Sequence, residues 1–160
     1  MKGIAIALVA QAGIPLLDNA LRQLGADLGD DYRVDEAALE AALCGPAPAC
    51  FAPLASRAGK PVGAVLAAPV FSTSRGGAGL FISDLWVAQG LRGQGLARQL
   101  LARSLHEGAG RNAGHFLKLS VYRDNPGALA ANGRLGFSVS ADELNMVLTG
   151  APLKTLKETA

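Results

Sequence analysis

The chain is poor in the residues that build metal centres and nucleic-acid surfaces. It has only two cysteines and two histidines, and its formal net charge is +2. Cys44 and Cys50 have no second Cys/His pair at ligand spacing, so the sequence predicts free thiols and no metal site. Because lysine and arginine do not cluster with interleaved aromatic residues, we expect no nucleic acid as a partner.

Long apolar runs are also missing. None approaches the ~20 residues that a membrane-spanning helix needs, so we expect no membrane partner. The first residues do combine Lys2, a short apolar run and Ala10-Gln11-Ala12, which is the pattern of a secretory signal. The competing interpretation, which we favour, is a buried strand over residues 4–9 that leads into a helix with Pro15 near its start.

Composition indicates one globular domain over residues 1–160. Hydrophobic residues make up 50% and charged residues 18%, which disfavours disorder, and neither a repeat nor a linker interrupts the chain. Periodicity and turn residues predict an α/β chain in the order β-α-α-β-β-β-α-β-α-β. The expected strands are residues 4–9, 51–56, 62–71, 80–87, 116–121 and 144–148. The expected helices are residues 15–28, 34–45, 96 onward, 125–136 and, as a short helix or tail, 152–158.

The most informative stretch runs from a strand, through a glycine-rich loop at residues 90–95, into a helix that begins at once. A tight loop at a helix start leaves several backbone N–H groups unpaired and aimed at one point, with the positive end of the helix dipole behind them. Gly93 and Gly95 let the backbone approach an anion without a Cβ in the way. Ala97 allows close packing, and Arg92 and Arg98 add positive charge. The loop therefore predicts a pyrophosphate site.

Two common phosphate ligands do not fit this loop. A dinucleotide fold needs a third glycine, where this chain has Arg98, and a triphosphate loop needs Gly-Lys-Ser or Gly-Lys-Thr, which the chain lacks. What fits is Arg-x-x-Gly-x-Ala over residues 92–97, and here the chain resembles the GNAT superfamily of N-acetyltransferases. The resemblance implies that the loop amides hold the pyrophosphate of acetyl-CoA. An ordinary glycine-rich strand-to-helix connection is the alternative.

A second motif follows in the order that the superfamily requires. Its pattern is Asn-x-x-Ala-x-x-x-Tyr-x-x-x-Gly-Phe; Asn125, Ala128, Gly136 and Phe137 match it, and Asn132 stands in place of the tyrosine. The resemblance implies a GNAT acyl-CoA N-acyltransferase fold over residues 4–150, with a twisted mixed sheet and helices on both faces. It also implies acetyl-CoA as cosubstrate, contacted by Leu85, Trp86, Val87, Arg92, Gly93, Gln94, Gly95, Leu96, Ala97, Arg98, Asn125, Ala128 and Asn132.

Three segments, residues 72–76, 84–87 and 144–150, resemble one branch of the superfamily, the diamine and thialysine acetyltransferases. In that branch the first segment reads Tyr-Ser-Thr-Trp-Arg-Gly and the strand reads Leu-Glu-Asp-Leu-Tyr-Val. Serine and glycine are also common in hairpin loops for backbone reasons alone.

Acetyl transfer to an amine needs a base, an oxyanion donor and an acid. The resemblance implies that a backbone N–H of residues 85–87 is the oxyanion donor. Ser83 and Asn132 stand where the branch has its glutamate and the superfamily its tyrosine. Asp84 is therefore our candidate base, the alternative being a carboxylate that merely orients a loop. Tyr122 is our candidate acid, the alternative being a packing residue with a wet hydroxyl.

Acidic residues follow the first expected helix, in a segment that borders the substrate cleft in the superfamily. Asp27, Asp30 and Asp31 suit a cationic amine such as a polyamine or a basic amino acid; a solvated acidic loop is the alternative. We therefore predict a small-molecule amine N-acetyltransferase. A non-catalytic acyl-CoA sensor and a protein N-terminal or lysine acetyltransferase are the other possibilities. The resemblance further implies a homodimer through the terminal strands, and the supply of acetyl-CoA implies a cytoplasmic location.

Overall fold

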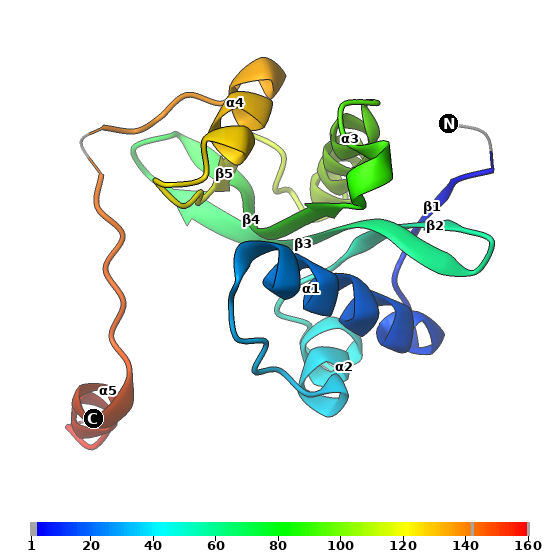
Figure 1. Ribbon diagram of the computed structural model, residues 1–160. Coiled ribbons are helices and arrows are strands. Elements are labelled where there is room, and N and C mark those ends of the chain that lie inside the picture. Colours follow the sequence, from blue (N-terminus) through cyan, green and yellow to red (C-terminus); the bar gives the residue numbers. More distant parts are fainter. Residues whose placement is uncertain (1–2, 142, 160) are drawn as a thin grey trace. The chain divides into compact units, whose positions relative to one another are not determined.

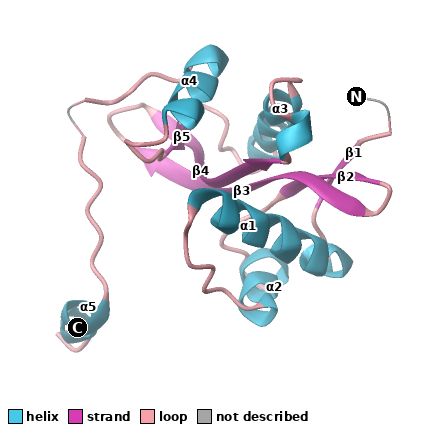
Figure 2. Ribbon diagram, viewed as in Figure 1, coloured by secondary structure: helices cyan, strands magenta, loops and turns pink. Residues whose placement is uncertain are grey.

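A computed structural model describes residues 3–141 and 143–159. By its contacts the chain divides into two compact units, residues 1–122 and residues 123–160. The first unit holds a five-stranded sheet in the order β1-β2-β3-β4-β5 (Figures 1 and 2). Its strands are antiparallel except for the parallel pair β4–β5, so the predicted mixed sheet is confirmed. The strands are β1 Ala5–Leu8, β2 Pro53–Arg57, β3 Lys60–Ser72, β4 Gly77–Val87 and β5 Leu117–Leu119.

Helices cover both faces of this sheet, as predicted (Figure 1). The helices α1 (Ile14–Leu28) and α2 (Glu36–Cys44) lie on one face, and α3 (Leu96–Ala109) lies on the other. Of two short 3₁₀ helices, η1 (Gln11–Gly13) precedes α1, and η2 (Gln89–Leu91) forms the start of the glycine-rich loop.

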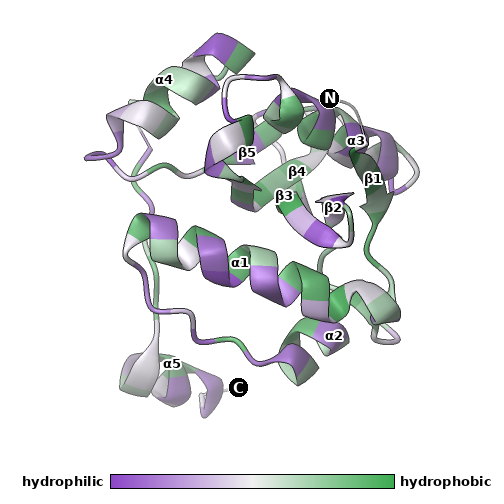
Figure 3. Ribbon diagram, turned by 45° about the vertical axis from the view of Figure 1, so that its right-hand side comes forward, coloured by the Kyte–Doolittle hydropathy of each residue, from purple (hydrophilic) through white to green (hydrophobic). Residues whose placement is uncertain are grey.

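The core is built from the apolar stripes of these helices. In Figure 3, hydrophobic and hydrophilic residues alternate along α1, as an amphipathic helix on a sheet requires. Leu17 and Leu21 of α1 pack with Leu39, Leu43 and Trp86 in one buried cluster. On the other face α3 approaches β3 so closely that a Cβ on Gly63 would lie 2.9 Å from Leu100 Cδ1.

Local signals set the element ends. Pro15 occupies the first turn of α1, and Gly29 ends this helix with a φ of 75°. The helix α2 begins two residues later than predicted because Asp35 is its N-cap, accepting the Ala38 N–H at 2.7 Å. The turn between β2 and β3 is a two-residue turn, with positive φ at Ala58 (50°) and Gly59 (73°).

The N-terminal segment forms a strand, as favoured over the secretory pattern. Residues 5–8 pair antiparallel with β2, from Ala5–Ser56 to Leu8–Pro53. Lys2, which belongs to the secretory pattern, lies outside the described residues. Within the part of the chain that the structure describes, none of the helices has the length and apolar character that crossing a bilayer requires.

The second unit contains α4 (Pro126–Leu135) and α5 (Gly150–Lys157), and it corrects one prediction. Residues 144–148 form no strand: Leu144, Met146 and Val147 are 85%, 93% and 84% exposed. An alternating pattern becomes a strand only beside another extended backbone, and this unit offers two helices instead. The helix predicted over 152–158 is confirmed as α5, and Gly136 ends α4 with the expected left-handed φ, 99°.

Candidate cofactor and acceptor site

The strand β4 carries a β-bulge at its centre. Leu66 of β3 pairs with Asp84, whereas the next β3 residue, Ala67, pairs with Ile82, so Ser83 is the extra residue. A bulge bends its strand and re-aims the neighbouring side chains. Here it divides β4 into a half that pairs with β5 and a half that runs on toward the glycine-rich loop. Neither glycine nor proline stands at this point of the chain, so the bulge could not be inferred from the residue types.

Beyond the bulge, one edge of β4 has no strand partner among the residues that the structure describes. Its parallel register with β5 runs from Leu80–Leu117 to Ile82–Leu119, whereas β4 itself continues to Val87. The Ala88 N–H donates to Val62 O of β3 at 3.0 Å. Because N–H directions alternate along a strand, the N–H groups of Leu85 and Val87 point the other way, toward the side that β5 has left. We call residues 83–87 on this side the open β4 edge.

The glycine-rich loop has the backbone that an anion cradle needs. Gly93 and Gly95 have φ angles of 75° and 84°, which are unfavourable for any residue with a Cβ. The first helical hydrogen bond of α3 runs from Gln99 N–H to Gly95 O at 3.2 Å, so the amides of residues 96–98 have no partner within the helix. A Cβ on either glycine would meet nothing within 4 Å. The loop is thus accessible, and its conformation is what requires glycine.

Arg92 does not extend from this loop. Its guanidinium folds back: Nε donates to Val87 O at 2.9 Å, and an Nη lies 2.5 Å from Asp27 Oδ2. The same carboxylate oxygen accepts the Trp86 indole N–H at 3.0 Å. Asp27, predicted to face an amine, and Arg92, predicted to face a phosphate, are therefore each other's partners.

Asp84 is a half-buried carboxylate beside the open β4 edge. Two residues before Trp86, it lies on the sheet face that α1 covers, where burial and then the charge of Asp84 raise the pKa of Cys50. Burial raises the pKa of Asp84 above its usual range, and the Ser83 hydroxyl, which donates to Oδ2 at 2.7 Å, opposes the shift. A carboxylate with a raised pKa is a better proton acceptor than an exposed one.

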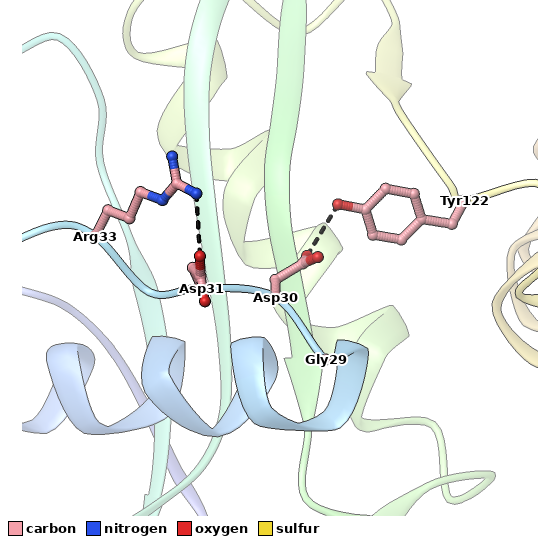
Figure 4. Close-up of a pocket in the computed structure, with 5 residues that line it drawn as sticks. All are labelled: Gly29, Asp30, Asp31, Arg33 and Tyr122. Atoms are coloured by element: carbon pink, nitrogen blue, oxygen red, sulfur yellow. Dashed lines mark hydrogen bonds and ion pairs between the residues drawn. The ribbon is translucent and has the colours of Figure 1, made fainter.

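An open pocket of about 530 Å³ lies between the loop after α1 and the end of β5 (Figure 4). Gly29, Asp30, Asp31, Arg33 and Tyr122 line it. The Tyr122 hydroxyl and the Asp30 carboxylate point toward each other, with the hydroxyl donating to Oδ2 at 2.9 Å. Asp31 and Arg33 form an exposed ion pair at 3.0 Å. Two carboxylates against one guanidinium leave the lining with net negative charge. The structure thus brings Asp30, Asp31 and Tyr122 together and places Asp27 elsewhere.

A buried cluster that sequence reasoning missed fixes this acidic loop (residues 29–33) to α1. Asp18 is only 5% exposed; its Oδ2 accepts from Arg22 Nε at 2.7 Å and its Oδ1 from the Tyr32 hydroxyl at 2.9 Å. The guanidinium of Arg22 lies over the Tyr32 ring, 4.5 Å from its centroid. Burial and the bond to Asp18 raise the pKa of Tyr32 to about 12. The available signal was an aspartate on the apolar stripe of α1, four residues before an arginine.

Asp18→Ala should therefore destabilise the protein by about 1.5–3 kcal/mol, the range for a hydrogen bond to a charged group. Urea unfolding measures the effect, and Tyr32→Phe, which removes only the hydroxyl, should show a smaller loss in the same direction. Asn19→Ala is the matched control, because Asn19 forms an exposed i,i+4 bond with Gln23 on the same helix. If Asp18→Ala were no more destabilising than Asn19→Ala, Asp18 would not be the anchor of the loop.

The remaining predicted cofactor residues belong to the second unit. Asn125 is the N-cap of α4, where its Oδ1 accepts the Ala128 N–H at 2.9 Å. Asn132 accepts the Phe137 N–H through its backbone carbonyl at the end of the same helix. Both motif ends thus have local structural roles in α4.

The sequence predicts free thiols, and the structure shows them. Cys44 and Cys50 are free thiols, and burial raises the pKa of Cys50. Within residues 3–141 and 143–159, no group of three or more His, Cys, Asp or Glu side chains is placed to hold a metal ion.

A mixed sheet whose parallel strands part beside a glycine loop and a helix N-terminus defines the acyl-CoA N-acyltransferase class of folds. Solved structures with this fold agree over nearly the whole chain. An integron cassette protein from the mobile metagenome of V. cholerae, VCH_CASS6, superposes with a TM-score of 0.78 at 18% identity, covering 99% of each chain. The aminoglycoside acetyltransferase meta-AAC0020 from an uncultured soil sample, solved with sisomicin, gives 0.75 at 15% identity, covering 92% of this chain and 97% of its own.

A predicted acetyltransferase from Clostridium acetobutylicum, solved with acetyl-CoA, gives a TM-score of 0.72 at 17% identity, covering 90% of this chain and 96% of its own. At such identities the likeness shows the fold alone. Among curated proteins, none matches the sequence. The family follows from the sequence itself: residues 17–137 match the profile of the acetyltransferase (GNAT) family, so the chain belongs to that family of acetyl-CoA-dependent N-acetyltransferases.

Proposed function

We propose that this protein transfers the acetyl group of acetyl-CoA to a primary amine of a small cationic molecule, by direct attack in a ternary complex. The observation that carries the proposal is the open β4 edge. It presents the N–H groups of Leu85 and Val87 on one side of the strand, next to a half-buried Asp84 with a raised pKa. An oxyanion donor and a base are thereby close together on the same short stretch of backbone.

In this proposal the glycine-rich loop holds the diphosphate of acetyl-CoA. Gly93, Gln94 and Gly95 and the first turn of α3 supply the amides, and the exposed Arg98 adds charge. The pantetheine arm would then lie along the open β4 edge. Asn125, Ala128 and Asn132 of α4 remain our candidates for contacts to the cofactor, as the family motif implies.

The chemistry requires one bond to form and one to break. The amine nitrogen attacks the thioester carbonyl carbon, the amides of Leu85 and Val87 stabilise the oxyanion, and the C–S bond then breaks. Asp84 accepts the proton that the amine loses, directly or through water. Tyr122 is our candidate for returning a proton to the thiolate. Holding both substrates in place supplies much of the remaining acceleration, up to ~7–11 kcal/mol in well-oriented cases.

The acceptor is proposed from the charge of the pocket. Asp30 and Asp31 outnumber the single guanidinium of Arg33, so a cation is favoured there. The resemblance to diamine and thialysine acetyltransferases supports an acceptor with more than one amine. So does the similar fold of an aminoglycoside acetyltransferase that was solved in complex with sisomicin. We also propose a single domain over residues 1–160, a homodimer and a cytoplasmic location.

The direct test is CoA release, followed with a thiol reagent, from acetyl-CoA and a panel of acceptors. The panel contains diamines, polyamines, basic amino acids, an aminoglycoside and a lysine-containing peptide. We expect the small polyamines or basic amino acids to stimulate release most. Binding of acetyl-CoA without stimulation by any acceptor would instead favour a non-catalytic sensor, and stimulation by the peptide alone would favour protein acetylation.

The acidic loop gives a sharper prediction. Asp30→Asn and Asp31→Asn should each raise the KM for the cationic amine about 10-fold, since a charge-assisted bond of about 1.5–3 kcal/mol is lost. The KM for acetyl-CoA should not move. Asp35→Asn, which keeps a side-chain oxygen to cap α2, is the matched control. Equal amine KM values in all of these variants would show that the acceptor binds elsewhere.

A further inference from the structure

One carboxylate joins three parts of the site. Asp27 lies in the last turn of α1, just before the acidic loop, and its Oδ2 accepts from both the Trp86 indole (3.0 Å) and the Arg92 guanidinium (2.5 Å). Trp86 belongs to β4, and Arg92 opens the cofactor-loop motif. Helix α1, strand β4 and the glycine-rich loop therefore share one anchor, formed by residues 59 and 65 positions away from Asp27.

Arg92 carries this anchor on to the strand backbone. Its Nε donates to Val87 O at 2.9 Å, and the N–H of the same residue, Val87, lies on the open β4 edge. The guanidinium thus bridges the carboxylate and the strand end. Its Nε and one Nη are directed at Val87 O and Asp27, so we assign the anion cradle to backbone amides, with Arg98 adding charge.

The exposure of the pair indicates what it contributes. The side chains of Asp27 and Arg92 are 44% and 51% exposed, and an ion pair in such a setting contributes little to the stability of a fold. The geometry of the pair is well defined although its energy is small, because two donors from different segments converge on one oxygen. A contact that adds little stability but has a strict geometry is expected to matter by fixing the positions of the groups that it joins.

We propose that Asp27 is a positioning residue for acetyl transfer. It holds Arg92 against the Val87 carbonyl, and so fixes the end of the open β4 edge and the start of the glycine-rich loop. It contacts neither substrate. This inference rests on the proposed function of the loop and of the strand edge, and it reassigns both Asp27 and Arg92 from substrate contacts to scaffolding of the cofactor site.

The test combines Asp27→Ala, Arg92→Lys and the double variant. Lysine keeps the charge of Arg92 but cannot reach Asp27 and Val87 O with two fixed donors. We expect each single variant to weaken acetyl-CoA binding, measured by calorimetry, about 2- to 5-fold, the effect that losing an exposed, oriented ion pair allows. The double variant should be no weaker than the worse single variant, because the two residues act through one contact. The KM for the amine should stay unchanged.

Two other variants separate this role from a structural one. Asp27→Asn retains an oxygen that can accept from both donors, so it should recover most of the acetyl-CoA affinity. Glu107→Gln, which alters the Arg103–Glu107 ion pair of α3 at 2.6 Å, is the control for losing a charged partner elsewhere. Melting temperatures are recorded for all variants, since a purely structural role predicts affinity losses that follow loss of stability.

Each alternative role of Asp27 or Arg92 predicts a different set of binding and KM results. If Asp27 binds the amine, Asp27→Ala raises only the amine KM. If Arg92 binds phosphate directly, Arg92→Lys weakens acetyl-CoA binding and Asp27→Ala does not. Additive effects in the double variant, or none in any variant, also overturn the proposal. Because calorimetry needs no turnover, these results remain readable even if no amine stimulates CoA release and the proposed function fails.

Discussion

Asp84→Asn is expected to lower kcat about 10²- to 10⁴-fold, the usual contribution of a general base. Asparagine keeps the size of the side chain and an oxygen that can accept from Ser83, so the bulge and the strand should persist. What disappears is the group that takes the proton from the attacking amine. The KM values for both substrates should change little, because the candidate base acts in the transition state rather than in binding.

The same substitution should leave the fold as stable or more stable at neutral pH. Burial raises the folded-state pKa of Asp84 above the ordinary value of 3.8. Between the ordinary and the raised value the folded state holds more protons than the unfolded state, so stability falls as pH rises through this window. Above the window the ionised, partly desolvated carboxylate costs stability, and asparagine removes that cost. The difference from the native protein should vanish at acid pH below the window.

Rate profiles against pH give a second measurement. In the native protein, kcat/KM should rise with pH as Asp84 loses its proton, with a midpoint above the usual carboxyl range. Ser83→Ala removes the hydrogen bond that opposes the pKa shift, so its acid limb should move to higher pH. An Asp84→Asn enzyme with native kcat, or an acid limb that Ser83→Ala leaves in place, would show that Asp84 is not the base.

The glycine-rich loop was the part of the candidate site that could best be predicted from sequence, because its conformation is determined locally. Gly93 and Gly95 are needed for positive φ, and the helix that follows has a strong apolar periodicity, so both the loop and the start of α3 could be predicted. The bulge at Ser83 could not, since it depends on how β4 registers with β3. The register between two strands is a tertiary property, and the residue types of β4 do not predict it.

Side-chain partners were the least predictable feature. Asp27, Arg92 and Trp86 carry no pattern that relates them, because they meet only when α1 packs across β4. Charge alone therefore suggested that the Asp27 carboxylate binds an amine and that the Arg92 guanidinium binds a phosphate, whereas the structure shows the two groups bonded to each other. The prediction of a strand at residues 144–148 was wrong for a related reason. The apolar pattern is a property of the segment alone, whereas a strand forms only where a neighbouring strand can pair with it.

Gly95→Val tests the anion cradle and should weaken acetyl-CoA binding about 10- to 100-fold. Gly95 is the N-cap of α3 with a φ of 84°, and a β-branched residue held there costs about 1–3 kcal/mol. Relief of that strain turns the local amides away from the point on which they converge. At about 1.4 kcal/mol for each tenfold change, the strain translates into the predicted loss of affinity. Gly93→Val, at a φ of 75°, should behave alike.

Gly90→Ala is the matched control, because it adds a Cβ to the same connection without the conformational demand. The added Cβ at residue 90 meets nothing within 4 Å, and Gly90 is not among the glycines with positive φ. Calorimetry with acetyl-CoA should therefore give native affinity for Gly90→Ala and large losses for the other two variants. If all three bound acetyl-CoA equally well, the diphosphate would not be held by these amides. The difference between the variants thus separates positions that need a positive φ from one that does not, and a site made of peptide N–H groups depends on that backbone conformation.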